Sequence, residues 1–152
     1  MRQLFEIDLQ DYEKNDRVFR RPSVRGIILK DEDKKEALIR KVKEEVGLIV
    51  IPESICEFGS VMRRQKSDVS PNAIFEQENF YYTCNTENQI VEQNLDDYEA
   101  EAEFILRFVS LDEAISVNAA YKSEDYFNEI MIKRETKVLQ MIKDTQMIME
   151  FI

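Results

Sequence analysis

The stretch from residue 35 to residue 50, KEALIRKVKEEVGLIV, constrains the fold of this chain more than any other stretch. Its apolar residues recur at helical spacing, which predicts a helix with one buried stripe made of Leu38, Ile39, Val42 and Val46. Gly47 ends this helix, because glycine adopts the left-handed conformation just past a helix without a Cβ penalty. The apolar run after Gly47 predicts a strand. We therefore expect a helix, a tight stop and a strand.

Two adjacent carboxylates, Glu44 and Glu45, fall in the last turn of the predicted helix. Neighbouring carboxylates can hold a hard cation such as Mg²⁺, which prefers oxygen ligands and keeps several waters that a phosphate can displace. An ordinary amphipathic helix with a solvated charged face has the same pattern, and it is the commoner case. The helical pattern by itself leaves both interpretations open.

The run from residue 40 to residue 48, RKVKEEVGL, resembles the second half of the Nudix box, in its MutT-like form. The family pattern is Gly, five residues, Glu, seven residues, then Arg-Glu-aliphatic-x-Glu-Glu-x-Gly-aliphatic. The matching positions are held by Arg40, Val42, Glu44, Glu45, Gly47 and Leu48. One position departs, because Lys41 stands where the family has a glutamate of the metal-binding and catalytic set. The box is therefore degenerate or truncated.

The resemblance implies an α+β fold, an α/β/α sandwich around a mixed β-sheet. It also implies Mg²⁺- or Mn²⁺-dependent hydrolysis of a nucleoside diphosphate linked to another moiety. Glu44 and Glu45 would be metal ligands and catalytic residues, and Arg40 and Gly47 would give structural support. A further catalytic carboxylate outside the box would be Glu78, with Glu76 as the alternative; both lie on one face of the aromatic strand predicted over residues 74–83.

The family places a hairpin strand and a glycine-rich loop between its first core strand and the box helix. Here the short charged connection KDEDKK leads directly into the helix. Gly26 and Glu32 fall at the spacing of the first half of the box, but Gly26 lies within VRGIIL, a strand sequence, whereas the loop must be flexible and polar. We therefore expect the hairpin strand and the glycine-rich loop to be missing near residues 30–33.

The substitution at Lys41 divides the functional hypotheses. An ammonium group one turn before Glu45 would pair with that carboxylate and compete with a metal ion. The first hypothesis is a Nudix-type hydrolase with reduced activity. The alternative is a catalytically inactive Nudix-fold module with a binding or regulatory role.

Composition excludes several other classes of protein. A length of 152 residues predicts a single domain, and a net charge of -10 argues against nucleic-acid binding. The absence of histidine disfavours zinc sites and histidine-based catalytic triads. Cys56 and Cys84 are expected to be free, buried thiols. No membrane span or signal peptide is recognisable, so we expect a cytoplasmic protein that acts on a small phosphorylated substrate.

The rest of the chain predicts further strands and two helical segments. Strands are expected over residues 4–9, 17–29 with an interruption at Pro22, 55–63 with a bulge or close approach at Gly59, 74–83 and 103–109. Residues 27–29 are the best candidate for a central strand, and residues 85–97 for a loop. Ser110 with Glu113 predicts a helix N-terminus. Residues 122–152 predict a C-terminal helical segment whose Met-rich end suits a core, with a homodimer face as an alternative.

Overall fold

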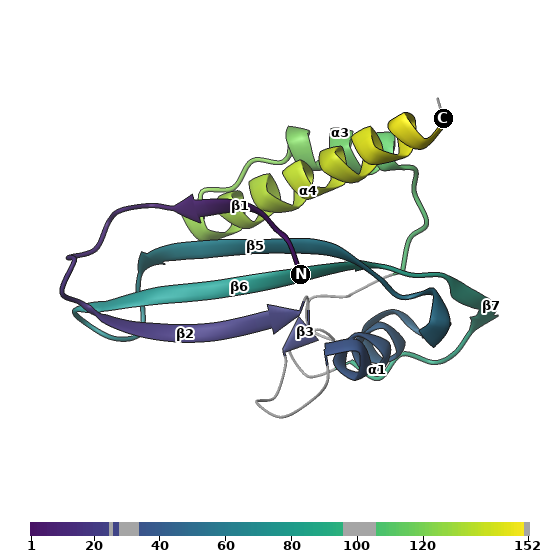
Figure 1. Ribbon diagram of the computed structural model, residues 1–152, viewed down its shortest axis with the longest axis horizontal. Coiled ribbons are helices and arrows are strands. Elements are labelled where there is room, and N and C mark those ends of the chain that lie inside the picture. The colour runs from purple at the N-terminus through teal and green to yellow at the C-terminus, as the bar shows by residue number, and fades with distance from the viewer. Residues whose placement is uncertain (25, 28–33, 96–105, 151–152) are drawn as a thin grey trace. The chain divides into compact units, whose positions relative to one another are not determined.

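The computed structural model describes residues 1–24, 26–27, 34–95 and 106–150 (Figure 1). The chain divides into two compact units, Met1–Leu106 and Arg107–Ile152. The expected single domain over residues 1–152 stays a prediction. The segment expected to be missing near residues 30–33 lies outside the described residues.

The first unit is built on a mixed five-stranded sheet in the order β1-β5-β6-β2-β3. Its strands are β1 (Gln3–Asp8), β2 (Arg17–Val24), β3 (Gly26–Ile27), β5 (Cys56–Lys66) and β6 (Ala73–Thr83). The β1–β5 and β2–β6 pairs are parallel, whereas the β5–β6 and β2–β3 pairs are antiparallel. Figure 1 shows the long strands β5 and β6 at the middle of this sheet. The predicted α+β class with a mixed sheet is confirmed.

The sequence explains why the central strands are long. β6 has the sequence AIFEQENFYYT, whose aromatic residues favour extended structure. Residues 67–72 connect β5 to β6, and the two strands form a hairpin. The buried apolar residues of the two strands include Val61, Ala73, Ile74 and Phe80. Gly59 lies where the register between β5 and β6 shifts, and a Cβ there would stand 2.5 Å from the Leu4 side chain. The expected bulge and close approach at Gly59 are therefore confirmed.

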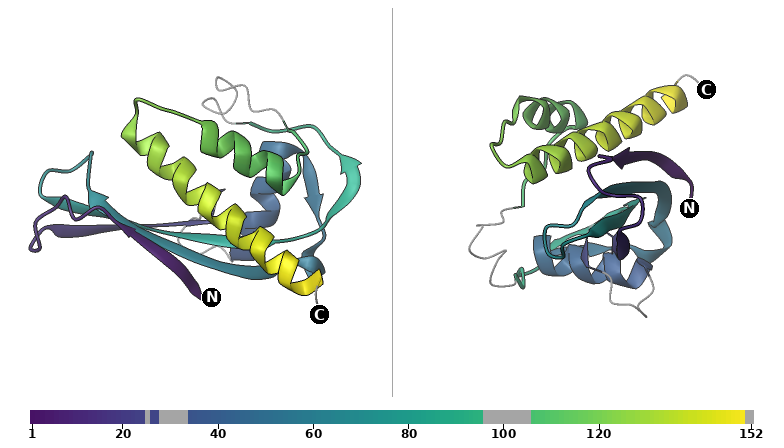
Figure 2. Two further views of the ribbon diagram at one scale, coloured as in Figure 1. Left: turned by 90° about the horizontal axis from the view of Figure 1, so that it is seen from above. Right: turned by 90° about the vertical axis from the view of Figure 1, so that its left-hand side faces the viewer.

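Helix α1 (Lys34–Val46) forms as predicted, but its stripe is less buried than expected. Ala37 is fully buried, whereas the stripe residues Leu38, Ile39, Val42 and Val46 are only half-buried. α1 contacts β2, the two-residue strand β3 and the three-residue strand β4 (Leu48–Val50), near one end of the sheet (Figures 1 and 2). Two of these three strands are only two and three residues long, so within the described parts of the chain they cover the helix face incompletely, which accounts for the difference.

Gly47 ends α1 with φ +71°, as predicted. A Cβ at this position would also lie 2.2 Å from the carbonyl oxygen of Val91, so both conformation and space require glycine. The chain then enters β4, which pairs antiparallel with β7 (Thr86–Ile90). The expectation of a loop over residues 85–97 is wrong for this part, because pairing with β4 makes a strand of TENQI despite its polar sequence.

Three further expectations need correction. β3 (Gly26–Ile27) lies at an edge of the sheet in the described chain, so it is not a central strand, and residues 28–29 lie outside the description. Residues 106–109 of the expected strand over 103–109 have no regular structure, and residues 103–105 lie outside the description. Cys56 is exposed and Cys84 is half-buried, so the prediction of free thiols is confirmed but that of two buried ones is wrong. Burial raises the pKa of the Cys84 thiol.

The second unit contains α3 (Leu111–Ala120) and α4 (Tyr126–Glu150), which lie side by side (Figure 2). The Ser110 hydroxyl accepts a hydrogen bond of 3.1 Å from the Glu113 amide, so the predicted N-cap is confirmed. The buried residues of α4 recur every four positions, at Ile130, Arg134 and Val138. Among the described residues, no helix combines the length and the apolar character that a membrane span requires.

Candidate functional site

Glu44 and Glu45 lie in the last turn of α1, and each forms an ion pair with the cation one turn earlier. Arg40 Nη1 lies 3.0 Å from Glu44 Oε2, and Lys41 Nζ lies 3.3 Å from Glu45 Oε1. The Lys41 side chain is only 15% exposed, which makes it the least exposed of these four. The ammonium group at the departing box position therefore lies beside one of the two carboxylates expected to bind metal.

The segment after β7 holds the end of α1 in place. The amides of Val91 and Asn94 donate to the carbonyls of Gly47 and Glu44, each at 2.8 Å, and the Gln93 side chain donates to the Glu45 carbonyl. These bonds satisfy carbonyls that have no partner within the helix. They tie the backbone of Glu44 and Glu45 to a distant part of the chain, which limits the positions that their side chains can reach.

Glu76 and Glu78 point to the same face of β6, but the structure gives them different surroundings. Glu76 is 3% exposed and accepts hydrogen bonds from Arg20 Nε and, at 2.6 Å, from Arg64 Nε. The two arginines are its direct neighbours on the flanking strands, because Arg20 pairs with Glu76 across β2–β6 and Arg64 across β5–β6. Burial raises the pKa of Glu76, but the hydrogen bonds from Arg64 and Arg20 lower it by a larger amount. The pKa of Glu76 therefore lies below its usual value.

A hollow of about 240 Å³ lies over this part of the sheet, and we call it the Glu76 hollow. Its lining consists of Arg20, Met62, Arg64, Glu76 and Glu78. Glu78, the expected catalytic carboxylate, is half-buried and lines the same hollow as Arg20 and Arg64.

Arg20 and Arg64 were not among the functional residues predicted from the sequence. One signal was present in the sequence. Side chains alternate between the two faces of β6, which places two carboxylates on a face with large rings, and such carboxylates require cations on the neighbouring strands.

The described residues contain no group of three or more acidic or cysteine side chains that could hold a metal ion together. Glu44, Glu45 and Glu78 are therefore not gathered into one three-carboxylate site. Mg²⁺ commonly binds proteins through one or two carboxylates and takes its other ligands from phosphate and water. The pair Glu44 and Glu45 fits that smaller donor set, with Lys41 as a competitor.

A model of the NUDIX domain matches residues 10–129, which is most of the chain. The chain belongs to the Nudix family. A search of curated proteins and a search of solved structures each return no match. The matched range holds α1, Lys41 and the Glu76 hollow, and it ends in the first turn of α4. The family assignment made from nine residues of the box is thus confirmed.

Proposed function

We propose that this Nudix-family chain is a hydrolase of a nucleoside diphosphate linked to another moiety, dependent on Mg²⁺ or Mn²⁺, with reduced activity. The observation that carries the proposal is the last turn of α1. It presents the adjacent carboxylates Glu44 and Glu45, but one of them is held 3.3 Å from the Lys41 ammonium. A metal ion must displace that ammonium before both carboxylates can serve as ligands, which lowers metal affinity.

Glu44 and Glu45 would hold the metal, which when bound neutralises phosphate charge and activates a water. Glu78 would accept a proton at a carboxylate oxygen on the sheet face. Arg20 is 76% exposed, and Glu76 holds it by Nε, so its terminal nitrogens can still donate to a phosphate. The buried Glu76 then orients this arginine and is not a metal ligand.

The inactive binding module is the second candidate, and a specific observation favours it. No three-ligand acidic group is present in the described parts of the chain, and the position that would supply the third carboxylate on α1 is Lys41. Such a module would retain binding of a phosphorylated ligand without turnover. A cytoplasmic location and a homodimer stay predictions under either candidate.

A hydrolysis assay separates the two candidates. The full-length chain would be tested against a panel of nucleoside diphosphate derivatives with Mg²⁺ and with Mn²⁺. Slow, metal-dependent release of a nucleotide is expected, and Glu44→Gln or Glu45→Gln should lower the rate at least tenfold. Glu36→Gln is the matched control, because Glu36 is an exposed glutamate in the first turn of the same helix.

Saturable binding of a panel compound without any turnover would overturn the hydrolase in favour of the module. Turnover that both glutamine variants leave unchanged would remove the α1 carboxylates from the mechanism.

A further inference from the structure

Glu78 has no hydrogen-bond donor among its direct neighbours in the sheet. In the sheet register it lies opposite Met62 of β5 and Pro22 of β2. A methionine side chain has no donor, and proline lacks even the backbone N–H. Lys34, a cation of α1, lies over the ring of Phe80, 3.5 Å from the ring centroid. Within the described parts of the chain, the half-buried Glu78 carboxylate forms no hydrogen bond and no ion pair, so it can accept both from a ligand.

Glu76, two residues earlier on the same face of β6, binds two arginines instead. Arg20 Nε donates to one of its oxygens, and Arg64 Nε donates to the other at 2.6 Å. The Arg20 side chain is 76% exposed, and its terminal nitrogens form no hydrogen bond with any residue that the structure describes. Because Arg20 is level with Glu76, it presents these donors about 7 Å along the strand from position 78, the rise of two residues.

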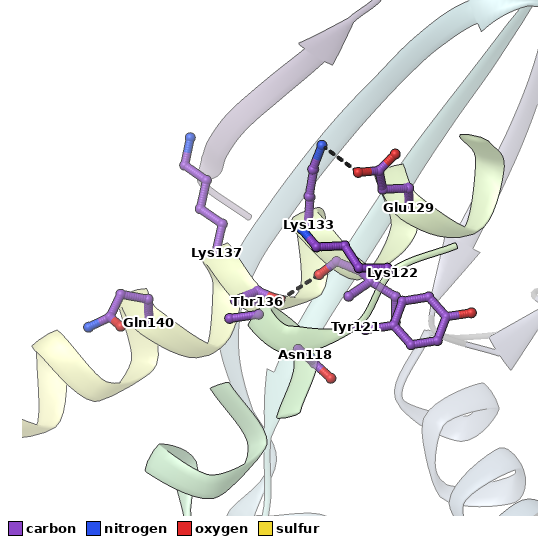
Figure 3. Close-up of a pocket in the computed structure, with 10 residues that line it drawn as sticks. Asn118, Tyr121, Lys122, Glu129, Lys133, Thr136, Lys137 and Gln140 are labelled. Atoms are coloured by element: carbon purple, nitrogen blue, oxygen red, sulfur yellow. Dashed lines mark hydrogen bonds and ion pairs between the residues drawn. The ribbon is translucent and has the colours of Figure 1, made fainter. Parts of the chain in front are cut away.

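The charges that line the Glu76 hollow balance one another. They are the guanidinium groups of Arg20 and Arg64 and the carboxylates of Glu76 and Glu78. A lone anion would be repelled by the open carboxylate, and a lone cation by the open guanidinium. The larger hollow of the second unit, of about 360 Å³, has no such open pair, because its glutamate, Glu129, already binds Lys133 at 3.1 Å (Figure 3). The Glu76 hollow therefore suits a ligand that carries both charges.

We propose that the Glu76 hollow binds the phosphate ester of a small amino alcohol. The phosphate accepts hydrogen bonds from the terminal nitrogens of Arg20, and the ammonium group donates to Glu78. The short carbon chain between them lies beside Met62, whose thioether packs against carbon. The role of this ester rests on the proposed function: the moiety linked to the nucleoside diphosphate is an amino alcohol. The ammonium group uses one oxygen of Glu78, which leaves the other for the proton.

The first test is an NMR titration of the full-length chain that follows the Met62 methyl signal. The three probes are phosphoethanolamine, ethyl phosphate, which lacks the amine, and ethanolamine, which lacks the phosphate. Phosphoethanolamine should bind saturably and at least tenfold more tightly than either of the others, because only it uses both charged groups. Equal affinities for phosphoethanolamine and ethyl phosphate would overturn the proposal, and so would saturation that leaves the Met62 signal unmoved.

Two variants separate the contributions of the two charged groups. Glu78→Gln should weaken phosphoethanolamine binding about tenfold without weakening ethyl phosphate binding, which also shows that the variant is folded. Arg20→Gln should weaken the binding of both phosphate esters. The matched controls are Glu36→Gln and Arg17→Gln, which remove the same charges at exposed positions that do not line the hollow. If Glu36→Gln weakens phosphoethanolamine binding as much as Glu78→Gln does, binding follows net charge alone and the proposal is wrong.

A hydrolysis assay tests the link to the proposed function. With Mg²⁺, a nucleoside diphosphate aminoethyl ester should be hydrolysed with at least tenfold higher kcat/KM than the ethyl ester, and equal values would overturn the assignment of the substrate. Hydrolysis of neither ester would contradict the proposed hydrolase, whereas the NMR titration decides on the hollow without any turnover. Sedimentation of the chain with phosphatidylethanolamine vesicles, lost in Glu78→Gln, would overturn the soluble substrate, because the headgroup of that lipid has the same chemistry.

Discussion

Replacement of Lys41 by glutamate tests the candidate metal site most directly. In the structure Lys41 Nζ lies 3.3 Å from Glu45, and its side chain is 15% exposed. Lys41→Glu restores the family residue at the departing position. It removes one ion pair and places a third carboxylate on the helix face that already carries Glu44 and Glu45.

The cost to stability follows from helix geometry. An i,i+4 ion pair on a helix contributes about 0.3–0.5 kcal/mol, and like charges at i,i+3 or i,i+4 cost a similar amount. Lys41→Glu loses one pair and adds two repulsions, so the free energy of unfolding should fall by about 1–1.5 kcal/mol. For a chain of this size, that loss lowers the Tm by about 2–6 °C.

Added Mg²⁺ should reverse this loss. A metal ion present at ten times its Kd stabilises the folded state by about 1.4 kcal/mol, because it binds only that state. The assay is thermal unfolding with and without Mg²⁺ for the parent and for Lys41→Glu, and the variant should show the larger rise in Tm. The variant should also bind Mg²⁺ more tightly in calorimetry, since hard-cation sites strengthen with ligand charge.

Lys43→Glu supplies the matched control, because it makes the same charge change at an exposed position of the same helix. Its Tm should rise with Mg²⁺ no more than that of the parent. If Lys41→Glu and Lys43→Glu respond equally to Mg²⁺, position 41 is not part of a metal site. If Lys41→Glu gains metal affinity but hydrolyses no substrate, Lys41 is not the main cause of inactivity, and the loss of the glycine-rich loop that the sequence predicts becomes the stronger explanation.

Three further predictions concern stability. Glu76→Gln should lower the free energy of unfolding by about 1–3 kcal/mol at pH 7, because it leaves two guanidinium groups without their carboxylate. The folded-state pKa of Glu76 lies below its usual value, so the ionised carboxylate stabilises the folded state. This stabilisation is fully present above the unfolded pKa, about 4.3, and is lost as the pH falls through the folded pKa. Urea unfolding should therefore show the gap between parent and variant shrinking below about pH 5, and a constant gap would contradict the ion-pair assignment. Gly47→Ala should lower the free energy of unfolding by about 2–4 kcal/mol, because φ is +71° and the new Cβ meets the Val91 carbonyl; a loss below about 0.5 kcal/mol in urea would refute this. Ser110→Ala should cost about 1 kcal/mol and speed hydrogen exchange at the Glu113 amide, and unchanged exchange would mean that the cap does not stabilise α3.

The sequence by itself determined the features that depend on residues close together in the chain. The helix that ends at Gly47, the pairs Arg40–Glu44 and Lys41–Glu45, and the cap at Ser110 all follow from spacings of three or four residues. Helix geometry fixes which side chains meet at such spacings, so no tertiary information is needed. The family resemblance rested on the same short stretch.

Only the tertiary structure decided which distant residues meet. Glu76 lies between Arg20 and Arg64 because β6 pairs with β2 on one side and with β5 on the other. The register of those pairs is set by the whole sheet, and a shift of one residue would turn each side chain to the opposite face. The pairing of the polar strand β7 with β4 depends on long-range contacts in the same way. A local pattern can show that a carboxylate will need a cation, but sheet register decides which cation it meets.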